Sequence, residues 1–343
     1  MSVHRPFPHR ATPPSVAPRP TPRCPATFGI LLALSAGLLA PARGADTPAP
    51  VSDRPAHISF SRSMFRGVNE NDANASLRSY AAALSRDAHL AVDPNPILFD
   101  GLGALRTLLR DDAVDTISLT VDEYLSIDDG LVTGPLMIAL VDGQLTEEYL
   151  LVVHRDSPIV RLANLRNHRL LMLDSVRASI APHWLEVLLA SEGLGLPAAF
   201  FADISRVTKP ARVALPVFFH QEDACVITRR GLDLIGELNH QVGAQLRILA
   251  TSPKIVPALT CFRANYPRAQ TERVSVAVSR SHLWPAGKQV MTIFQCDRVE
   301  AQPLSALNPT RDLWTAYRRF HGPDSEGLAL PAAPPPLIKG GSP

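Results

Sequence analysis

The segment from Asp174 to Pro182, which reads DSVRASIAP, concentrates side chains that bind anions. The hydroxyls of Ser175 and Ser179 donate hydrogen bonds, and the guanidinium of Arg177 forms bidentate pairs with oxyanions. The segment directly follows an apolar run, RLLML, and directly precedes a helical pattern, so it lies where a helix N-terminus favours negative charge. We therefore predict an oxyanion site here. The alternative is that Ser179 caps the helix and Arg177 is a solvated surface residue.

A second hydroxyl-rich segment, FSRSMFRGVNEN, follows the first expected strand at 57–60. Its Ser61 and Ser63 offer donors for the oxygen atoms of a ligand, and its Phe65 offers an apolar wall. A plain turn after a strand explains the same residues, so both interpretations stay open.

Catalytic and nucleotide-binding signatures are absent from the sequence. There is no GxSxG, GxxxxGK[ST] or HExxH, and no GxGxxG that opens a helix after a strand. Histidines such as His154, His168, His183, His220 and His240 do not recur in pairs at one-turn spacing. We therefore expect no enzyme, no metal site and no cofactor.

Alternating strand and helix patterns must position these segments. Buried-strand runs are expected at 57–60, 113–119, 135–141, 149–154, 165–173, 225–228, 246–250 and 258–262. Helical spacing of apolar residues predicts helices at 73–88, 97–110, 182–191 and 308–320, and a further one that carries Leu232, Ile235 and Leu238. This order is typical of an α/β protein with mostly parallel sheets flanked by helices.

Residues 207–266 carry a likeness to a known family. Asp223 and Ala224 open a strand, Asp233 starts the next helix, and ELN, QLRILATSP and a proline-containing strand ending in Phe262 follow in order. This block resembles the phosphate, phosphite and phosphonate substrate-binding proteins of ABC importers. A looser likeness extends from about 57 to 320.

The resemblance implies a two-lobed type 2 periplasmic binding protein fold with two hinge crossovers. The first lobe is expected at 57–150 plus 259–320, and the second at 151–258. In such a fold the ligand binds between the lobes, at the carboxyl ends of the strands. The implied function is capture of a small oxyanion by hinge closure and its delivery, by a monomer, to an ABC permease in the inner membrane.

The resemblance also implies roles for single residues. The loop with Ser175 and Ser179 corresponds to the cluster that grips the phosphonate oxygens, and Tyr124 corresponds to an aromatic residue of the cleft. A half-buried core tyrosine is the alternative for Tyr124. The neighbouring Asp122 and Glu123 would repel a bare anion, which weakens a simple phosphate assignment.

Two acidic residues, Glu222 and Asp223, form the remaining candidate contact. The matching acid in aminophosphonate-binding relatives contacts a ligand ammonium, which is a charge-assisted hydrogen bond. The alternatives are an exposed carboxylate at the entry to a strand and an ion pair with Arg229.

Composition indicates export. Residues 1–45 contain Arg5, Arg10, Arg19, Arg23 and Arg43 but no acid, and residues 28–40 form an apolar run too short to span a bilayer. We expect a signal peptide at 1–45, a periplasmic mature protein, a disordered linker at 46–56 and a proline-rich disordered tail at 324–343. Removal of the five arginines changes the formal net charge from +2 to −3, so a nucleic-acid partner is not expected.

Three cysteines, Cys225, Cys261 and Cys296, follow the predicted leader. Their apolar surroundings favour buried thiols, although a disulfide between two of them stays an alternative.

Two other functions also stay open. One is a periplasmic sensor or partner-binding protein of the same fold, linked to a signalling or uptake system. The other is an enzyme on the two-lobed fold, such as a thiamine-precursor synthase, for which the sequence shows no cofactor lysine or cysteine cluster.

Overall fold

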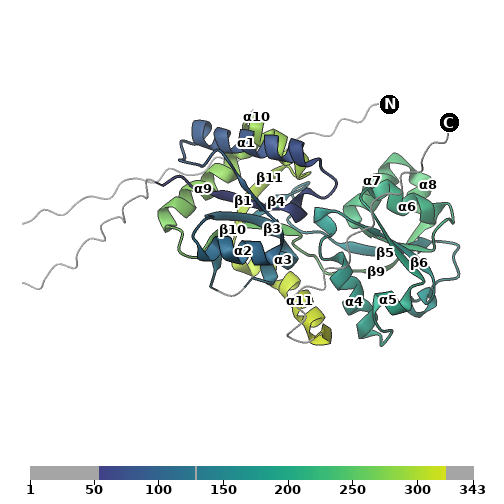
Figure 1. The fold of residues 1–343 in the computed structure, drawn as a ribbon. Helices are drawn as coiled ribbons and strands as arrows, with labels where there is room; N and C mark the ends of the chain where they lie inside the picture. Colours follow the sequence, from purple (N-terminus) through teal and green to yellow (C-terminus); the bar gives the residue numbers. More distant parts are fainter. Residues whose placement is uncertain (1–53, 128–129, 322–343) are drawn as a thin grey trace, which may run out of the picture. The chain divides into compact units, whose positions relative to one another are not determined.

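The computed structural model describes residues 54–127 and 130–321, which form two β-sheets flanked by helices on both faces (Figure 1). Both sheets belong to one compact unit of the chain. The predicted signal peptide at 1–45 and the predicted tail at 324–343 lie outside the described residues. The α/β class expected from the strand and helix patterns is confirmed.

The first sheet has six strands in the order β11-β4-β10-β3-β1-β2. The strands are β11 (Arg298–Gln302), β4 (Val132–Leu140), β10 (Ala258–Arg263), β3 (Thr116–Thr120), β1 (Ile58–Ser61) and β2 (Ile97–Phe99). β1 is parallel to β2 and β3, whereas β10 is antiparallel to β3 and β4. Alternation along the strands gives the sheet two apolar faces, because Ile58 and Phe60 pack in one hydrophobic cluster and Ile117 and Leu119 in another.

Helices cover both faces of the first sheet. α1 (Glu70–Asp87), α9 (Arg268–Arg280) and α10 (Pro285–Ile293) cover one face, and α2 (Gly101–Arg110) and α3 (Val121–Leu125) cover the other (Figure 1). Helix α1 begins where Asn69 caps it, since its side-chain oxygen accepts from the N–H of Asn71 at 2.9 Å. Leu77, Tyr80 and Leu84 then recur at helical spacing and face the sheet.

The second sheet has five strands in the order β7-β6-β8-β5-β9. These are β7 (Asp203–Val207), β6 (Arg169–Leu173), β8 (Ala224–Thr228), β5 (Tyr149–His154) and β9 (Leu246–Thr251). Helices α4 (Ala181–Ser191) and α5 (Pro197–Phe200) lie on one face, and α6 (Pro210–Phe218), α7 (Arg229–Leu238) and α8 (His240–Gln245) lie on the other (Figure 1). Every residue of β5 and β8 is buried, which explains their unbroken apolar sequences.

The chain crosses from the first sheet to the second between β4 and β5, and returns between β9 and β10. The two crossing segments pair with each other: the N–H of Glu147 donates to Ile255 at 2.7 Å, and the N–H of Ile255 donates to Glu147 at 2.8 Å. β5 begins at Tyr149 and β10 at Ala258, so the chain changes sheet shortly before each of these residues.

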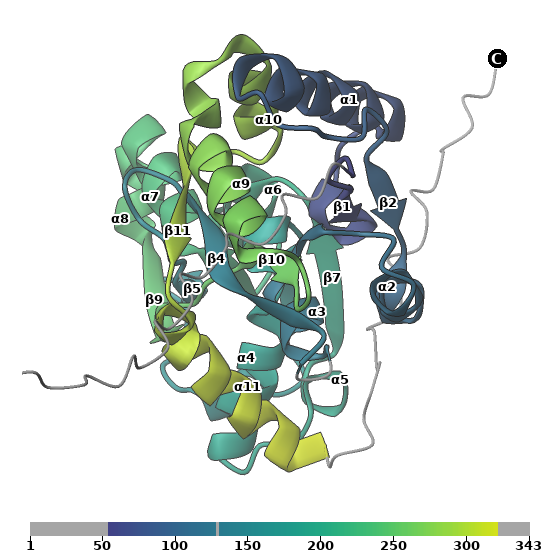
Figure 2. The same ribbon diagram turned by 90° about the vertical axis from the view of Figure 1, so that its left-hand side faces the viewer.

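The last helix, α11 (Asn308–His321), packs mainly against α4 of the second sheet and also contacts α3 (Figure 2). The sequence assigned this helix to the first lobe alone. Thr310 ties its start to the returning segment, because its hydroxyl accepts from the N–H of Val256 at 3.0 Å. The helix therefore joins the layers of both sheets.

One predicted helix, at 97–110, is partly wrong. Ile97–Phe99 is the edge strand β2, paired with β1 from Ser59 to Ser61, and only Gly101–Arg110 is helical. Gly101 has φ +73°, a conformation that glycine adopts without the clash of a Cβ atom, and this residue separates the two elements.

The expectation of buried, unbonded cysteines is confirmed for Cys225, Cys261 and Cys296.

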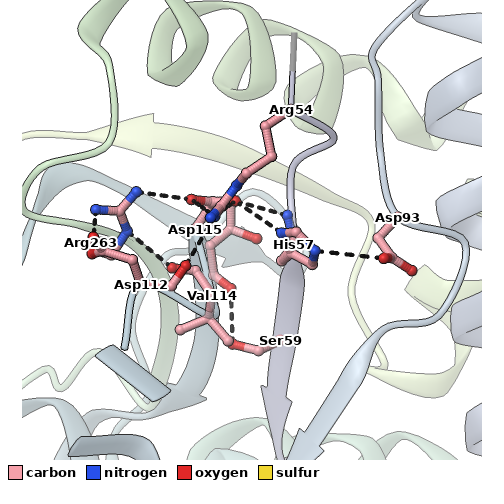
Figure 3. A network of polar contacts seen from close by, with 9 residues as sticks. Arg54, His57, Ser59, Asp93, Asp112, Val114, Asp115 and Arg263 are labelled. Atoms are coloured by element: carbon pink, nitrogen blue, oxygen red, sulfur yellow. Dashed lines mark hydrogen bonds and ion pairs between the residues drawn. The ribbon is translucent and has the colours of Figure 1, made fainter. Parts of the chain in front are cut away.

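A buried carboxylate, Asp115, organises the amino-terminal edge of the first sheet (Figure 3). It accepts from Nη2 of Arg54 at 2.9 Å, from the N–H of His57 at 2.9 Å and from Nη2 of Arg263 at 3.1 Å. Ala56 is also buried and pairs with Val92. The expected disorder of 46–56 is therefore wrong for residues 54–56, which are held by contacts with residues far along the chain.

Candidate functional site

The loops that follow β1 and β6 meet where the carboxyl ends of the two sheets face each other. Nη1 of Arg66 lies 2.7 Å from Oδ1 of Asp174 and joins the two loops by an ion pair. Gly67, with φ +77°, packs beside Thr208, which follows β7. Ligands of open α/β sheets bind outside the carboxyl ends of the strands, so this junction is the candidate site.

Two arginines, Arg66 and Arg206, bring positive charge to this junction. Arg206, on β7, lies beside Met172 of β6 and is partly buried. Burial lowers the pKa of Arg206, the charge of Arg66 lowers it further, and Asp174 acts in the opposite direction. Both guanidinium groups interact with the carboxylate of Asp174, and the charge of Arg66 also acts on the carboxyl of Asp122. Arginine stays protonated in proteins, so the arrangement retains a positive charge for an anion.

The structure brings Ser61 and Ser63 together, but around a carboxylate of the protein. Oε1 of Glu123 accepts from Oγ of Ser61 at 2.6 Å, and Oε2 accepts from Oγ of Ser63 at 2.8 Å. Oε2 also accepts from the N–H of Thr120 at 3.0 Å and from its hydroxyl at 2.9 Å. Glu123 is thus the capping-box acid of α3 and the acceptor for two serines that the sequence predicted to face a ligand.

The predicted loop DSVRASIAP is tied to the crossing segments. The hydroxyl of Ser179 donates to the carbonyl of Pro257 at 2.9 Å, and Nε of Arg177 binds the carboxylate of Glu147. Both alternatives are therefore wrong: Ser179 does not cap α4, and Arg177 is not solvated, since only 14% of its side chain is exposed. Ser175 is half-buried and begins a 3₁₀ turn, its carbonyl accepting from the N–H of Ala178 at 3.0 Å.

Tyr124 is a core residue in the structure. Its side chain is 8% exposed and packs in the hydrophobic cluster that contains Ile117 and Leu119. This agrees with the core-tyrosine alternative. The nearby Asp122 is half-buried, and burial of its carboxyl raises the pKa of that group above the usual range.

Glu222 and Asp223 lie away from the other candidates. Oδ2 of Asp223 accepts from the N–H of Arg169 at 2.9 Å and lies 3.2 Å from Nδ1 of His168, while Glu222 lies 3.5 Å from Nε of Arg169. These residues occupy the amino-terminal ends of β6 and β8, whereas Asp174 follows the carboxyl end of β6. An ion pair of either acid with Arg229 was also expected as an alternative and is wrong, because Arg229 binds Glu148.

Sequence reasoning did not predict roles for Arg66, Arg206, Glu123 and Glu147. The available signal was positional, since Arg66 lies in the predicted loop after the first strand and Arg206 is the penultimate residue of β7. Within 54–127 and 130–321, no group of His, Cys, Asp and Glu could hold a metal ion. None of the helices in those ranges is long and apolar enough to cross a bilayer.

Residues 69–305 match the family model of the periplasmic phosphonate substrate-binding proteins of ABC transporters. Because the match covers more than half of the chain, the protein belongs to this family. Its role is periplasmic solute binding, and such transporter components are generally not enzymes. No curated protein shows a significant match to the chain.

Solved structures share the fold at low sequence identity. A Xanthomonas citri protein bound to chloride is 17% identical with a TM-score of 0.57, over 78% of this chain and 98% of its own. The binding-protein component of an ABC phosphonate transporter from Pseudomonas aeruginosa is 17% identical with a TM-score of 0.51, over 78% and 88%. PhnD1 from Prochlorococcus marinus, in complex with methylphosphonate, is 14% identical with a TM-score of 0.51, over 78% and 98%. The type 2 periplasmic binding fold implied by the sequence is confirmed.

Proposed function

We propose that the protein captures a small oxyanion of the phosphonate, phosphite or phosphate class where the loops after β1, β6 and β7 meet, and delivers it to an ABC permease. Arg66 and Arg206 supply the charge, and Ser175 at the start of the 3₁₀ turn supplies a hydroxyl. The two guanidinium groups at the carboxyl ends of the strands carry this proposal. Family membership and the methylphosphonate complex of PhnD1 support the ligand class.

The ligand itself is the first thing to measure. We expect one member of a panel of phosphate, phosphite, methylphosphonate, 2-aminoethylphosphonate, sulfate and short sulfonates to raise the melting temperature. A ligand at a hundred times its dissociation constant adds about 2.7 kcal/mol to stability. No shift with any member of the panel contradicts the proposed function.

Arg206→Met is expected to weaken binding of that ligand about 10- to 100-fold. A hydrogen bond to a charged group contributes about 1.5–3 kcal/mol, and each 1.4 kcal/mol is tenfold in affinity. The substitution removes the partly buried guanidinium of Arg206 and keeps an unbranched side chain of similar length. Isothermal titration calorimetry measures the change.

The matched control is Arg268→Met. The Arg268 side chain is 93% exposed and pairs with Glu272 one helical turn along α9, so its loss should leave the affinity unchanged. Equal losses in the two variants would indicate a long-range charge effect rather than contact with Arg206.

A second candidate function, a periplasmic sensor or partner-binding protein of the same fold, is favoured by one observation. Glu123 already accepts the hydroxyl hydrogen bonds of Ser61, Ser63 and Thr120, which removes donors that the sequence offered to an anion. Lack of binding across the panel, together with capture of a membrane signalling or uptake protein by the purified protein, supports this candidate.

A further inference from the structure

A cavity of about 100 Å³ lies against the face of the first sheet that α1, α9 and α10 cover. Its walls are mainly apolar. Phe60, Met137 and Phe262 come from the sheet, and Val274, Val290 and Phe294 come from the helices and the end of α10. Arg66, Arg206 and Ser175, the residues proposed above to hold the oxyanion, do not line this cavity.

Three methionines, Met64, Met137 and Met291, form part of the cavity lining. Thioether side chains are flexible and polarizable, so such a wall adjusts to the shape of an apolar guest. The volume is smaller than that of an apolar cavity of about 150 Å³ that binds benzene. A short aliphatic chain fits this size and this lining.

Polar atoms in the lining indicate that the ligand carries a polar group as well as an aliphatic chain. The hydroxyls of Ser118 and Thr260 lie 2.6 Å apart and satisfy each other. Arg177 differs: it reaches the cavity from the 3₁₀ turn after β6, and its Nη2 is buried without a hydrogen-bond partner among residues 54–127 and 130–321. A buried donor without an acceptor is costly, so this atom marks a position for an acceptor.

The charge of Arg177 is already balanced, because its Nε binds the carboxylate of Glu147 and that side chain is only 5% exposed. An anionic ligand would compete with this buried carboxylate and would need a second balancing charge. An uncharged oxygen accepts a hydrogen bond from Nη2 of Arg177 without competing with Glu147 and without requiring a second balancing charge.

We propose that this cavity binds a small neutral aliphatic molecule with one acceptor oxygen, such as a short alcohol or ketone. The oxygen accepts from Nη2 of Arg177, and the chain packs against Phe60, Phe294 and the three methionines. Because Val176 and Arg177 belong to the turn after β6 of the second sheet and most other walls belong to the first sheet and its helices, the bound molecule contacts elements of both. The site is separate from the proposed oxyanion site.

The test is a titration of the protein labelled with ¹³C at the methionine methyl groups. Butanol and butanone are expected to shift the signals of Met64, Met137 and Met291, whereas butyrate at the same concentration is not. Met172 lies on β6 and outside the cavity lining, so its signal is an internal control. Butyrate shifts as large as those of butanol, or no shift with butanol at tens of millimolar, would overturn the proposal.

Two variants test the apolar wall and the polar donor of the site separately. Ala139→Leu places a larger side chain in the cavity wall and is expected to abolish the butanol shifts. Arg177→Lys keeps a cation opposite Glu147 but loses the forked donor, so butanol affinity is expected to fall about tenfold while binding of xenon, which needs no acceptor, is retained. Persistence of the butanol shifts in Ala139→Leu would place the alcohol elsewhere.

Binding of butanol is expected to be independent of binding of the oxyanion. Arg206→Met is expected to bind butanol as the unchanged protein does, since Arg206 does not line the cavity. A protein that fails to bind any oxyanion but binds butanol would therefore retain this inference.

Discussion

Replacing Asp115 with alanine is expected to lower the free energy of unfolding by about 3–5 kcal/mol, the usual cost of removing one partner from a buried ion pair. Asp115 is 1% exposed and binds Arg54, the N–H of His57 and Arg263 (Figure 3). Its loss leaves the Arg263 side chain, 11% exposed, with reduced charge compensation, and leaves the N–H of His57 without its acceptor. Urea unfolding measures the change as a lower midpoint at unchanged slope.

Asp112→Ala is the matched control for this prediction. Asp112 binds the same guanidinium, with Oδ1 2.6 Å from Nη1 of Arg263, but its side chain is 59% exposed. Exposed ion pairs contribute about 0–1 kcal/mol, so the control is expected to change stability little. Equal losses in the two variants would mean that the network does not depend on the burial of Asp115.

Acidification is expected to destabilise the protein through His183, which lies in α4 and packs against α11. Its ring centroid is 4.4 Å from that of Tyr317 and 5.2 Å from that of Trp314. Burial, together with the charges of His321, Arg206 and Arg66, lowers the pKa of His183 to about 4.

The sign follows from the depressed pKa of His183. The folded state favours the neutral ring, so the contribution is complete above pH 6.5, the ordinary histidine value, and is lost as the pH falls towards 4. With 1.36 kcal/mol for each pKa unit, the loss at pH 4.5 is about 2.5 kcal/mol. Urea unfolding at pH 7 and pH 4.5 measures it.

His183→Phe isolates this contribution. The aromatic packing against Trp314 and Tyr317 is kept, and the titrating group, whose Nδ1 is buried without a hydrogen-bond partner among the described residues, is removed. The variant is expected to lose about 2.5 kcal/mol less than the unchanged protein between pH 7 and pH 4.5. His240→Gln, at an exposed position on α8, is the control and should follow the unchanged protein. The same pH dependence in His183→Phe would assign the loss to other groups.

Local patterns in the sequence determined much of the fold. The unbroken apolar run at Tyr149–His154 predicted β5 with its observed limits, and the run 246–250 predicted all but one residue of β9. Helical spacing predicted α4 and α11 within one residue at each end. These features depend on the alternation of burial along one segment, which the order of residues records directly.

Segments whose form depends on their neighbours were less predictable. Ile97–Phe99 has an apolar pattern that suits a helix or a strand, and pairing with β1 makes it a strand. Arg54 and Ala56 lie in a proline-rich, polar stretch, and Asp115 and Val92 hold them in place. The sequence of each segment contains no information about a partner that lies tens of residues away.

The sequence by itself determined the family and the α/β class, and it showed that two loops carry hydroxyl and guanidinium donors. The tertiary structure alone decided which of those side chains remain available to a ligand. Ser61 donates to Glu123 across 62 positions, Arg66 binds Asp174 across 108, and Arg177 binds Glu147 across 30. Hydroxyls and charges bind whichever complementary group the fold brings within about 3 Å. Strand register and loop path fix that group, and neither is a property of one segment.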